Sequence, residues 1–160
     1  MSLTLAFMTL LLGVEFPSLQ DIGTIAPYYE LSQEDYSVYS AVINGIYVSE
    51  KTKRIVILNE TKERQILKPQ FHLNVPCVLI TREEANELCI QCADTPFYER
   101  YPDSPGYIKL SGISFNSRLS RASVLIERYC GILCAEGIYV TLIKQDGIWV
   151  VQSKNVSWES

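Results

Sequence analysis

The sequence predicts a single α+β domain in which helices come first and a curved antiparallel β-sheet, a C-terminal meander, packs on them. Two helix-capping signals occur before residue 93, and four strand-like segments follow residue 106. An Asp-Gly pair between the last two segments is a strong hairpin signal. Helices and sheet are thus separated along the chain, which is typical of an α+β fold.

Length and composition exclude several classes of protein. The chain has 160 residues, of which 48% are hydrophobic and 20% charged, with seven prolines and eight glycines. Disordered, collagen-like and coiled-coil proteins have different compositions. The net charge of −4 disfavours binding to nucleic acid or to an anionic membrane surface. We therefore expect one folded domain whose partner is a protein or a small ligand.

The first residues have the character of a leader. Residues 2–14 (SLTLAFMTLLLGV) carry no charge, and the run is too short for a transmembrane span but matches the apolar region of a secretory signal. We expect residues 1–14 to be a signal or hydrophobic leader, residues 15–31 a linker or arm, and residues 32–160 the domain. The protein is then exported to the periplasm, the cell envelope or the exterior. The alternative is a buried N-terminal helix or strand, because a basic start and a clear cleavage site are missing.

A capping box opens the first predicted helix. Ser32 is followed three residues later by Asp35, and the apolar residues after them recur at helical spacing. The residues of this face are Tyr36, Tyr39, Ile43 and Ile46. Core packing is the first explanation for tyrosines in such a face.

Two short strands and a second helix follow. The β-branched run Arg54–Leu58 and the segment Val78–Ile80 predict strands. Thr81 with Glu84 is a second capping box, and it predicts a helix that continues to about Cys92. Residues 95–106 contain three prolines and three aromatic residues, which indicates a loop.

The second half of the chain predicts a meander. Its four candidate strands are Tyr107–Phe115, Ala122–Tyr129, Gly137–Lys144 and Ile148–Gln152. A two-residue turn at Asp146-Gly147 would pair Leu142 with Val151 and Lys144 with Trp149. Strand alternation then places one apolar face toward a core, formed by Ile138, Val140, Leu142, Trp149 and Val151. This order of elements is shared with cystatin-like and nuclear-transport-factor-2-like folds, an analogy that carries no function.

Several short motifs in this half recur at fixed offsets. They are YPxSxG at 101–106, LS at 110–111, FN at 115–116, CGxLCxxGxY at 130–139, LxKxxGxWxV at 142–151 and WxS at 158–160. With these motifs the chain resembles a group of uncharacterised bacterial proteins, mostly small and with the features of export. It departs from the group at residues 112–114 and at Ala135. The group has no established activity, so the resemblance implies a fold and export but no mechanism.

Cys130 and Cys134 flank a short loop between two predicted strands. A loop of this size brings its ends within the roughly 4.4–6.8 Å Cα separation of a disulfide. We expect a disulfide that holds a hairpin loop in one shape, and two unpaired buried thiols are the alternative.

The other three cysteines leave the pairing open. Cys89-x-x-Cys92 resembles a redox motif, but it lies at the C-terminus of the predicted helix, whereas thioredoxin-type thiols need a helix N-terminus. A zinc site made with the pair at 130 and 134 would need 37 intervening residues, more than the usual spacing. Structural or mutually bridged cysteines are the simpler interpretation, with Cys77 left over. We expect no metal and no cofactor.

His72 is the only histidine, so histidine-dependent nucleophilic catalysis would have to use it. It lies in the apolar segment Phe71-His72-Leu73, where a structural histidine is commoner. No phosphate-binding, dinucleotide-binding or nucleophile-elbow motif occurs in the sequence. We predict no catalytic residue.

Three tyrosines, Tyr98, Tyr101 and Tyr107, cluster in the proline-rich loop, where exposure and contact with partners are expected. The first hypothesis is therefore an exported, non-enzymatic binding or structural domain that uses this loop and the Cys130–Cys134 hairpin. One alternative is a small pocket enzyme on a nuclear-transport-factor-2-like fold. A second alternative is a thiol redox or zinc protein that uses Cys89 and Cys92.

Overall fold

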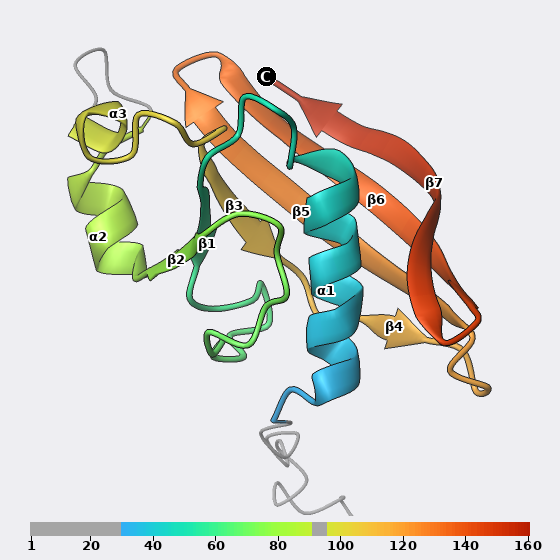
Figure 1. Ribbon diagram of the computed structural model, residues 1–160. Coiled ribbons are helices and arrows are strands. Elements are labelled where there is room, and N and C mark those ends of the chain that lie inside the picture. Colours follow the sequence, from blue (N-terminus) through green and yellow to red (C-terminus); the bar gives the residue numbers. More distant parts are fainter. Residues whose placement is uncertain (1–29, 91–95) are drawn as a thin grey trace, which may run out of the picture.

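Seven strands form one curved, mostly antiparallel sheet in the computed structural model, which describes residues 30–90 and 96–160 (Figure 1). The strand order is β2-β1-β3-β5-β6-β7, and β4 pairs with β5 outside this path. The strands are β1 (Ile55–Leu58), β2 (Cys77–Ile80), β3 (Tyr107–Leu110), β4 (Ser114–Phe115), β5 (Arg121–Gly131), β6 (Cys134–Gln145) and β7 (Ile148–Glu159). With its helices this sheet confirms the α+β prediction. The predicted leader and all but the last two residues of the predicted arm lie outside the described residues.

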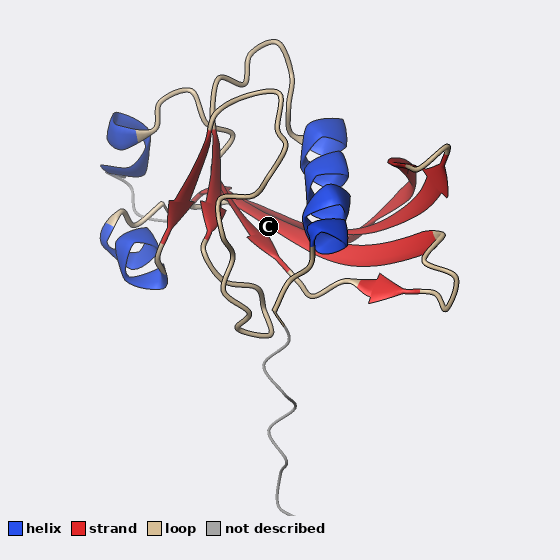
Figure 2. Ribbon diagram, turned by 60° about the horizontal axis from the view of Figure 1, so that its bottom comes forward, coloured by secondary structure: helices blue, strands red, loops and turns tan. Residues whose placement is uncertain are grey.

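Helix α1 (Gln33–Ile46) packs on the face around which the sheet curves (Figure 2). It begins as predicted: the Ser32 hydroxyl accepts a hydrogen bond from the Asp35 backbone, and the Asp35 carboxylate accepts one from the Ser32 backbone. The predicted apolar face is buried at Tyr36, Tyr39 and Ile43 and half-buried at Ile46. Opposite it lie inward side chains of β5, β6 and β7: Ala122, Val124, Ile126, Ile138, Val140, Leu142 and Trp149.

The strands nearest the other edge of the sheet are parallel. β1 pairs in parallel with both β2 and β3, and all four of its residues are buried. A strand between two parallel neighbours is covered on both faces and has no alternating pattern. The sequence indicated both short strands, but it gave no signal for their parallel pairing.

Two short helices cover the face of β1 and β2 that points away from α1 (Figure 2). Helix α2 (Arg82–Glu87) begins at the predicted cap, where the Thr81 hydroxyl accepts a hydrogen bond from the Glu84 backbone. It ends five residues earlier than predicted, because Leu88 is its C-cap and Cys89 has a left-handed backbone with φ of 38°.

The predicted loop at residues 95–106 contains a helix, α3 (Pro96–Arg100), which corrects the prediction. Proline at the first position of a helix costs no backbone hydrogen bond. Phe97 and Tyr101, one helical turn apart, are both buried against the second apolar cluster. The aromatic residues thus make this segment helical through packing.

The last hairpin has the predicted register. Leu142 pairs with Val151 and Lys144 with Trp149, across a turn in which Asp146 and Gly147 have φ of 49° and 81°. Strand β7 continues well beyond the predicted end at Gln152, and two irregularities interrupt its pairing with β6. The predicted strand 107–115 is divided into β3 and β4. Within the described residues, every helix is too short or too polar to cross a membrane.

Candidate functional site

The β5–β6 hairpin ends in a turn closed by two cysteines. Cys130 and Cys134 lie at disulfide distance, with their Cα atoms 5.0 Å apart, as the sequence predicted. The enclosed turn exposes two aliphatic side chains: Ile132 is 57% and Leu133 is 85% exposed. We call residues 130–134 the hairpin tip. It combines an apolar surface with a constrained backbone.

Tyr98 connects α3 to the hairpin tip. Its hydroxyl donates a hydrogen bond of 2.9 Å to the Cys130 carbonyl oxygen. Its ring contacts Phe97 edge-on, with centroids 5.2 Å apart, and Phe97 is fully buried. Burial raises the pKa of Tyr98, so the phenol stays protonated as a donor at neutral pH. The structure therefore brings together one of the predicted loop tyrosines and the predicted disulfide loop.

The other two loop tyrosines do not form an exposed surface, which corrects the sequence-based expectation. Tyr101 is only 4% exposed, and its hydroxyl donates to Glu84 Oε1 at 3.2 Å. Tyr107 is half-buried on β3 and stacks on Tyr129 of β5 at a centroid distance of 5.0 Å. Both rings cover the sheet beside α2 and α3, which is a structural role.

A group of charged and polar side chains lies next to the hairpin tip. Arg128 Nε lies 2.8 Å from Glu136 Oε1 as an ion pair, without the alignment of a hydrogen bond. The Arg128 guanidinium also lies over the Tyr47 ring, 5.6 Å from its centroid, and the Tyr47 hydroxyl donates to Glu136. Burial raises the pKa of Tyr47, with a smaller contribution from the Glu136 charge. A cavity of about 210 Å³ beside this group extends to Leu133.

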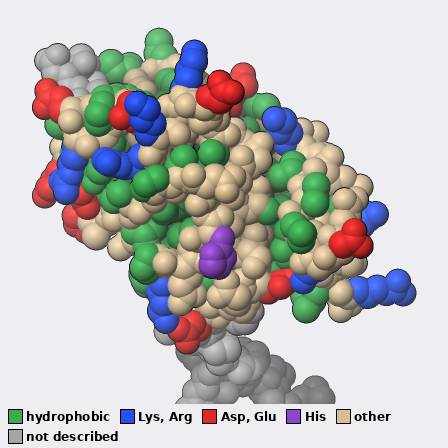
Figure 3. Space-filling model, in the orientation of Figure 1, with side chains coloured by type: hydrophobic (Ala, Val, Ile, Leu, Met, Phe, Trp, Pro, Cys, Tyr) green, Lys and Arg blue, Asp and Glu red, His purple; other side chains and the backbone are tan. Residues whose placement is uncertain are grey.

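His72 is exposed, because the backbone of residues 71–75 alternates and turns its apolar neighbours toward the core. It is the purple side chain on the face shown in Figure 3. Its Nε2 lies 3.2 Å from Gln33 Nε2, and its backbone hydrogen-bonds with Ser40 and Asn44 of α1. Among the described residues, no carboxylate and no nucleophile is hydrogen-bonded to the ring. This geometry fixes the loop on α1 and provides no acid–base pair.

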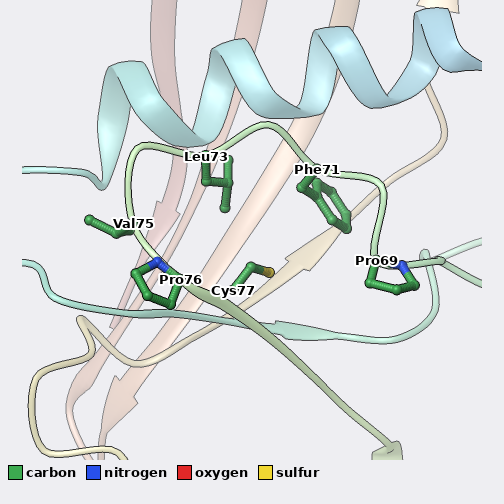
Figure 4. A pocket seen from close by; sticks show the side chains of 6 residues that line it. All are labelled: Pro69, Phe71, Leu73, Val75, Pro76 and Cys77. Carbon is green, nitrogen blue, oxygen red and sulfur yellow. The ribbon is translucent and has the colours of Figure 1, made fainter.

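Cys77 lines a pocket of about 290 Å³ under the same loop (Figure 4). The other lining residues are Pro69, Phe71, Leu73, Val75 and Pro76. Burial raises the pKa of the Cys77 thiol to about 11, so the nucleophilic thiolate is scarce at neutral pH. The thiol behaves as a small apolar side chain.

Cys89 follows α2 and is disulfide-bonded, whereas Cys92 lies outside the described residues. A zinc site shared with Cys130 and Cys134 would compete with the disulfide at the hairpin tip. In residues 30–90 and 96–160, no three metal-binding side chains are grouped closely enough to hold an ion.

A larger groove, of about 470 Å³, crosses the outer surface of α1 toward the start of β7. No local pattern in the sequence indicates this groove, because its lining residues come from segments that are far apart in the chain. No protein-family model matches the sequence, and comparisons with curated proteins and with solved structures give no significant match.

Proposed function

We propose that this chain is an exported, non-enzymatic binding domain that presents its hairpin tip to a protein partner. One observation carries the proposal: Leu133 is 85% exposed on a turn whose two ends are joined by a disulfide. A rigid apolar side chain loses little conformational entropy on binding and is suited to a pocket of a partner.

The size of the tip favours a protein over a lipid surface. Burying Ile132 and Leu133 completely would contribute roughly 1.5–3 kcal/mol for each side chain. A single myristoyl chain has many more buried carbons and still binds membranes only marginally. Two aliphatic side chains are therefore too few for membrane attachment, but they are enough to anchor a protein interface.

Export is consistent with the cysteines and with the resemblance of the motifs at residues 101–160. Disulfides persist in oxidising compartments and are rare in the cytosol. Intact-mass measurement of protein from the native host tests this part of the proposal. We expect the mature chain to begin between roughly Val14 and Ile25, and a full-length cytoplasmic species would contradict export.

Photo-cross-linking tests the binding surface. A benzoylphenylalanine at position 133, in cells of the native host, should give one discrete adduct with another protein. The matched control is position 119, because Leu119 is also exposed but lies on a loop outside the hairpin tip. The adduct should fall by about tenfold when Cys130 and Cys134 are both replaced by serine, since the free turn must then be ordered on binding.

Other results would overturn the proposal. Equal adducts from positions 133 and 119 would indicate non-specific contact, and no adduct would indicate that the tip is not an interface. Flotation of the purified chain with phosphatidylcholine vesicles is the third measurement. Retention on the vesicles that is lost in Leu133→Ser would assign the tip to a lipid surface instead.

A further inference from the structure

Strand β7 forms an open edge of the sheet. It is the last strand in the order of the sheet, and within the described residues no strand pairs with its outer side. It has 12 residues, whereas β2 at the opposite edge has 4. Most of its side chains are exposed. A long edge with unpaired backbone donors and acceptors can bind another extended chain.

The groove over α1 begins beside the first residues of β7. It is lined by Ser37, Ala41 and Asn44 of α1, by His72, and by Ile148 and Trp149 of β7. The sheet curves around α1 so closely that a Cβ on Gly45 would lie 3.3 Å from Val151 Cγ2. The ribbons show the sheet curling around α1 with β7 at its edge (Figures 1 and 2), so a strand added beyond β7 would continue this curvature toward the helix. In Figure 3, hydrophobic side chains reach the surface on the side of the view where β7 lies.

Lys154 places a positive charge on this side of β7. It is in register with Val140, which belongs to the core under α1, so both side chains point to the face that carries α1. Lys154 is exposed, and none of the ion pairs within the described part of the chain involves it. Because this ammonium group has no carboxylate partner among those ion pairs, it is a local positive charge, on a chain of net charge −4, that an acidic group of a ligand can neutralise.

We propose that the edge of β7 and the groove over α1 bind an extended peptide of a partner protein that carries an acidic side chain. The peptide adds to the sheet as an eighth strand through backbone hydrogen bonds to β7. Its alternate side chains face α1 in the groove, and its carboxylate pairs with Lys154. The groove and the hairpin tip lie at opposite ends of β6, so this site is independent of the proposed function.

Charge and size argue against a second copy of the chain on this edge. Lys154 lies near the middle of β7, so an antiparallel pair of β7 strands would bring two lysines together at its twofold axis. The groove has eight lining residues, whereas a stable protein interface engages roughly 20–30 residues on each side. A single extended segment fits this space better than a whole sheet with its helix.

Selection from a displayed random peptide library on the full chain tests the proposal. We expect enriched peptides with an Asp or Glu at a fixed position, and slower hydrogen exchange at alternate amides of β7 in their presence. Synthetic versions methylated at alternate backbone nitrogens provide the sharpest test. One alternate set should abolish binding, because it removes donors to β7, and the other set should bind normally.

Matched variants locate the site. Lys154→Glu should weaken binding by about tenfold or more, whereas Lys51→Glu, an exposed lysine in a loop, should not change it. Ala41→Arg should fill the groove and weaken binding similarly, whereas Asn86→Arg on α2 should bind normally. Circular dichroism confirms that each variant is folded.

Three outcomes would overturn the proposal. The first is a failure to enrich any peptide, or enriched peptides that protect residues 130–134 instead of β7. The second is an affinity of the enriched peptides for the chain that changes neither on N-methylation of the peptide nor in the Lys154→Glu variant. The third is a dimer of the free chain in which the outer amides of β7 are already protected, which would assign this edge to a second copy.

Discussion

The indole ring of Trp158 lies directly over Gly137. A Cβ atom on Gly137 would come within 2.2 Å of Trp158 Nε1, a distance that no folded protein tolerates without movement. The two residues pair across β6 and β7, and Trp158 also contacts Tyr129 of β5, with ring centroids 6.1 Å apart. Glycine at 137 thus allows the tryptophan to cover the outer face of three neighbouring strands.

The close approach predicts a cost for the smallest substitution. Gly137→Ala should lower the free energy of unfolding by about 1–3 kcal/mol, because the indole must move from its place on the sheet. Denaturant unfolding measures the change. The double variant Gly137→Ala, Trp158→Val should lose less than the sum of the two single variants, because the steric conflict is then absent. Strict additivity would contradict the contact.

The disulfide at the hairpin tip should contribute little to global stability. It closes a loop of only about five residues, so its effect on the unfolded chain is on the order of 2 kcal/mol at most. Replacing Cys130 and Cys134 by serine should lower the Tm by roughly 4–8 °C at most. Hydrogen exchange should accelerate at residues 130–134 while the rest of β5 and β6 keeps its protection. A loss of protection throughout the sheet would show that the disulfide supports the fold.

The turn between β6 and β7 depends on the backbone of Gly147. Its φ is 81°, and nothing lies within 4 Å of a Cβ at this position, so the effect of a side chain there is purely conformational. Gly147→Val should lower the free energy of unfolding by more than about 1 kcal/mol, because a β-branched residue resists positive φ. Gly147→Asn is the matched control and should lose less, since asparagine tolerates this conformation. Equal unfolding midpoints for the two variants would contradict the turn geometry.

The buried thiol of Cys77 predicts a pH dependence. Its pKa is raised from 9.0 to about 11 by burial. Between these values the unfolded thiol loses its proton while the folded thiol keeps it, so rising pH favours the unfolded state. The free energy of unfolding should therefore fall from about pH 9 to about pH 11, and it should fall less in Cys77→Ala. Denaturant unfolding at a series of pH values measures the free energy of unfolding of the parent and of Cys77→Ala. The difference between the two proteins at each pH cancels the contribution of the tyrosines, which both proteins share. Parallel pH profiles would contradict a raised thiol pKa.

Local signals determined the elements whose geometry depends on neighbours in the chain. The hydroxyl of Ser32 reaches a backbone three residues away, so the start of α1 was predictable to the residue. Asp146-Gly147 and the alternation around it specified the pairing of Leu142 with Val151, because a two-residue turn leaves one register with an apolar face.

Tertiary structure decided the features that depend on long-range packing. β1 lies in parallel between β2 and β3 because its four buried residues need cover on both faces, which no local pattern expresses. Phe97 and Tyr101 pack into the second apolar cluster, and this packing makes a helix of a segment with loop composition. It also buries Tyr101, which was expected to be exposed. The hydrogen bond from Tyr98 to the Cys130 carbonyl oxygen and the groove between α1 and β7 join residues that are distant in the chain. These residues come into contact only when the sheet curves. The sequence therefore specified the turns, the helix caps and the apolar–polar alternation of the strands. The burial of whole faces of the sheet against the helices decided which side chains lie together on the surface.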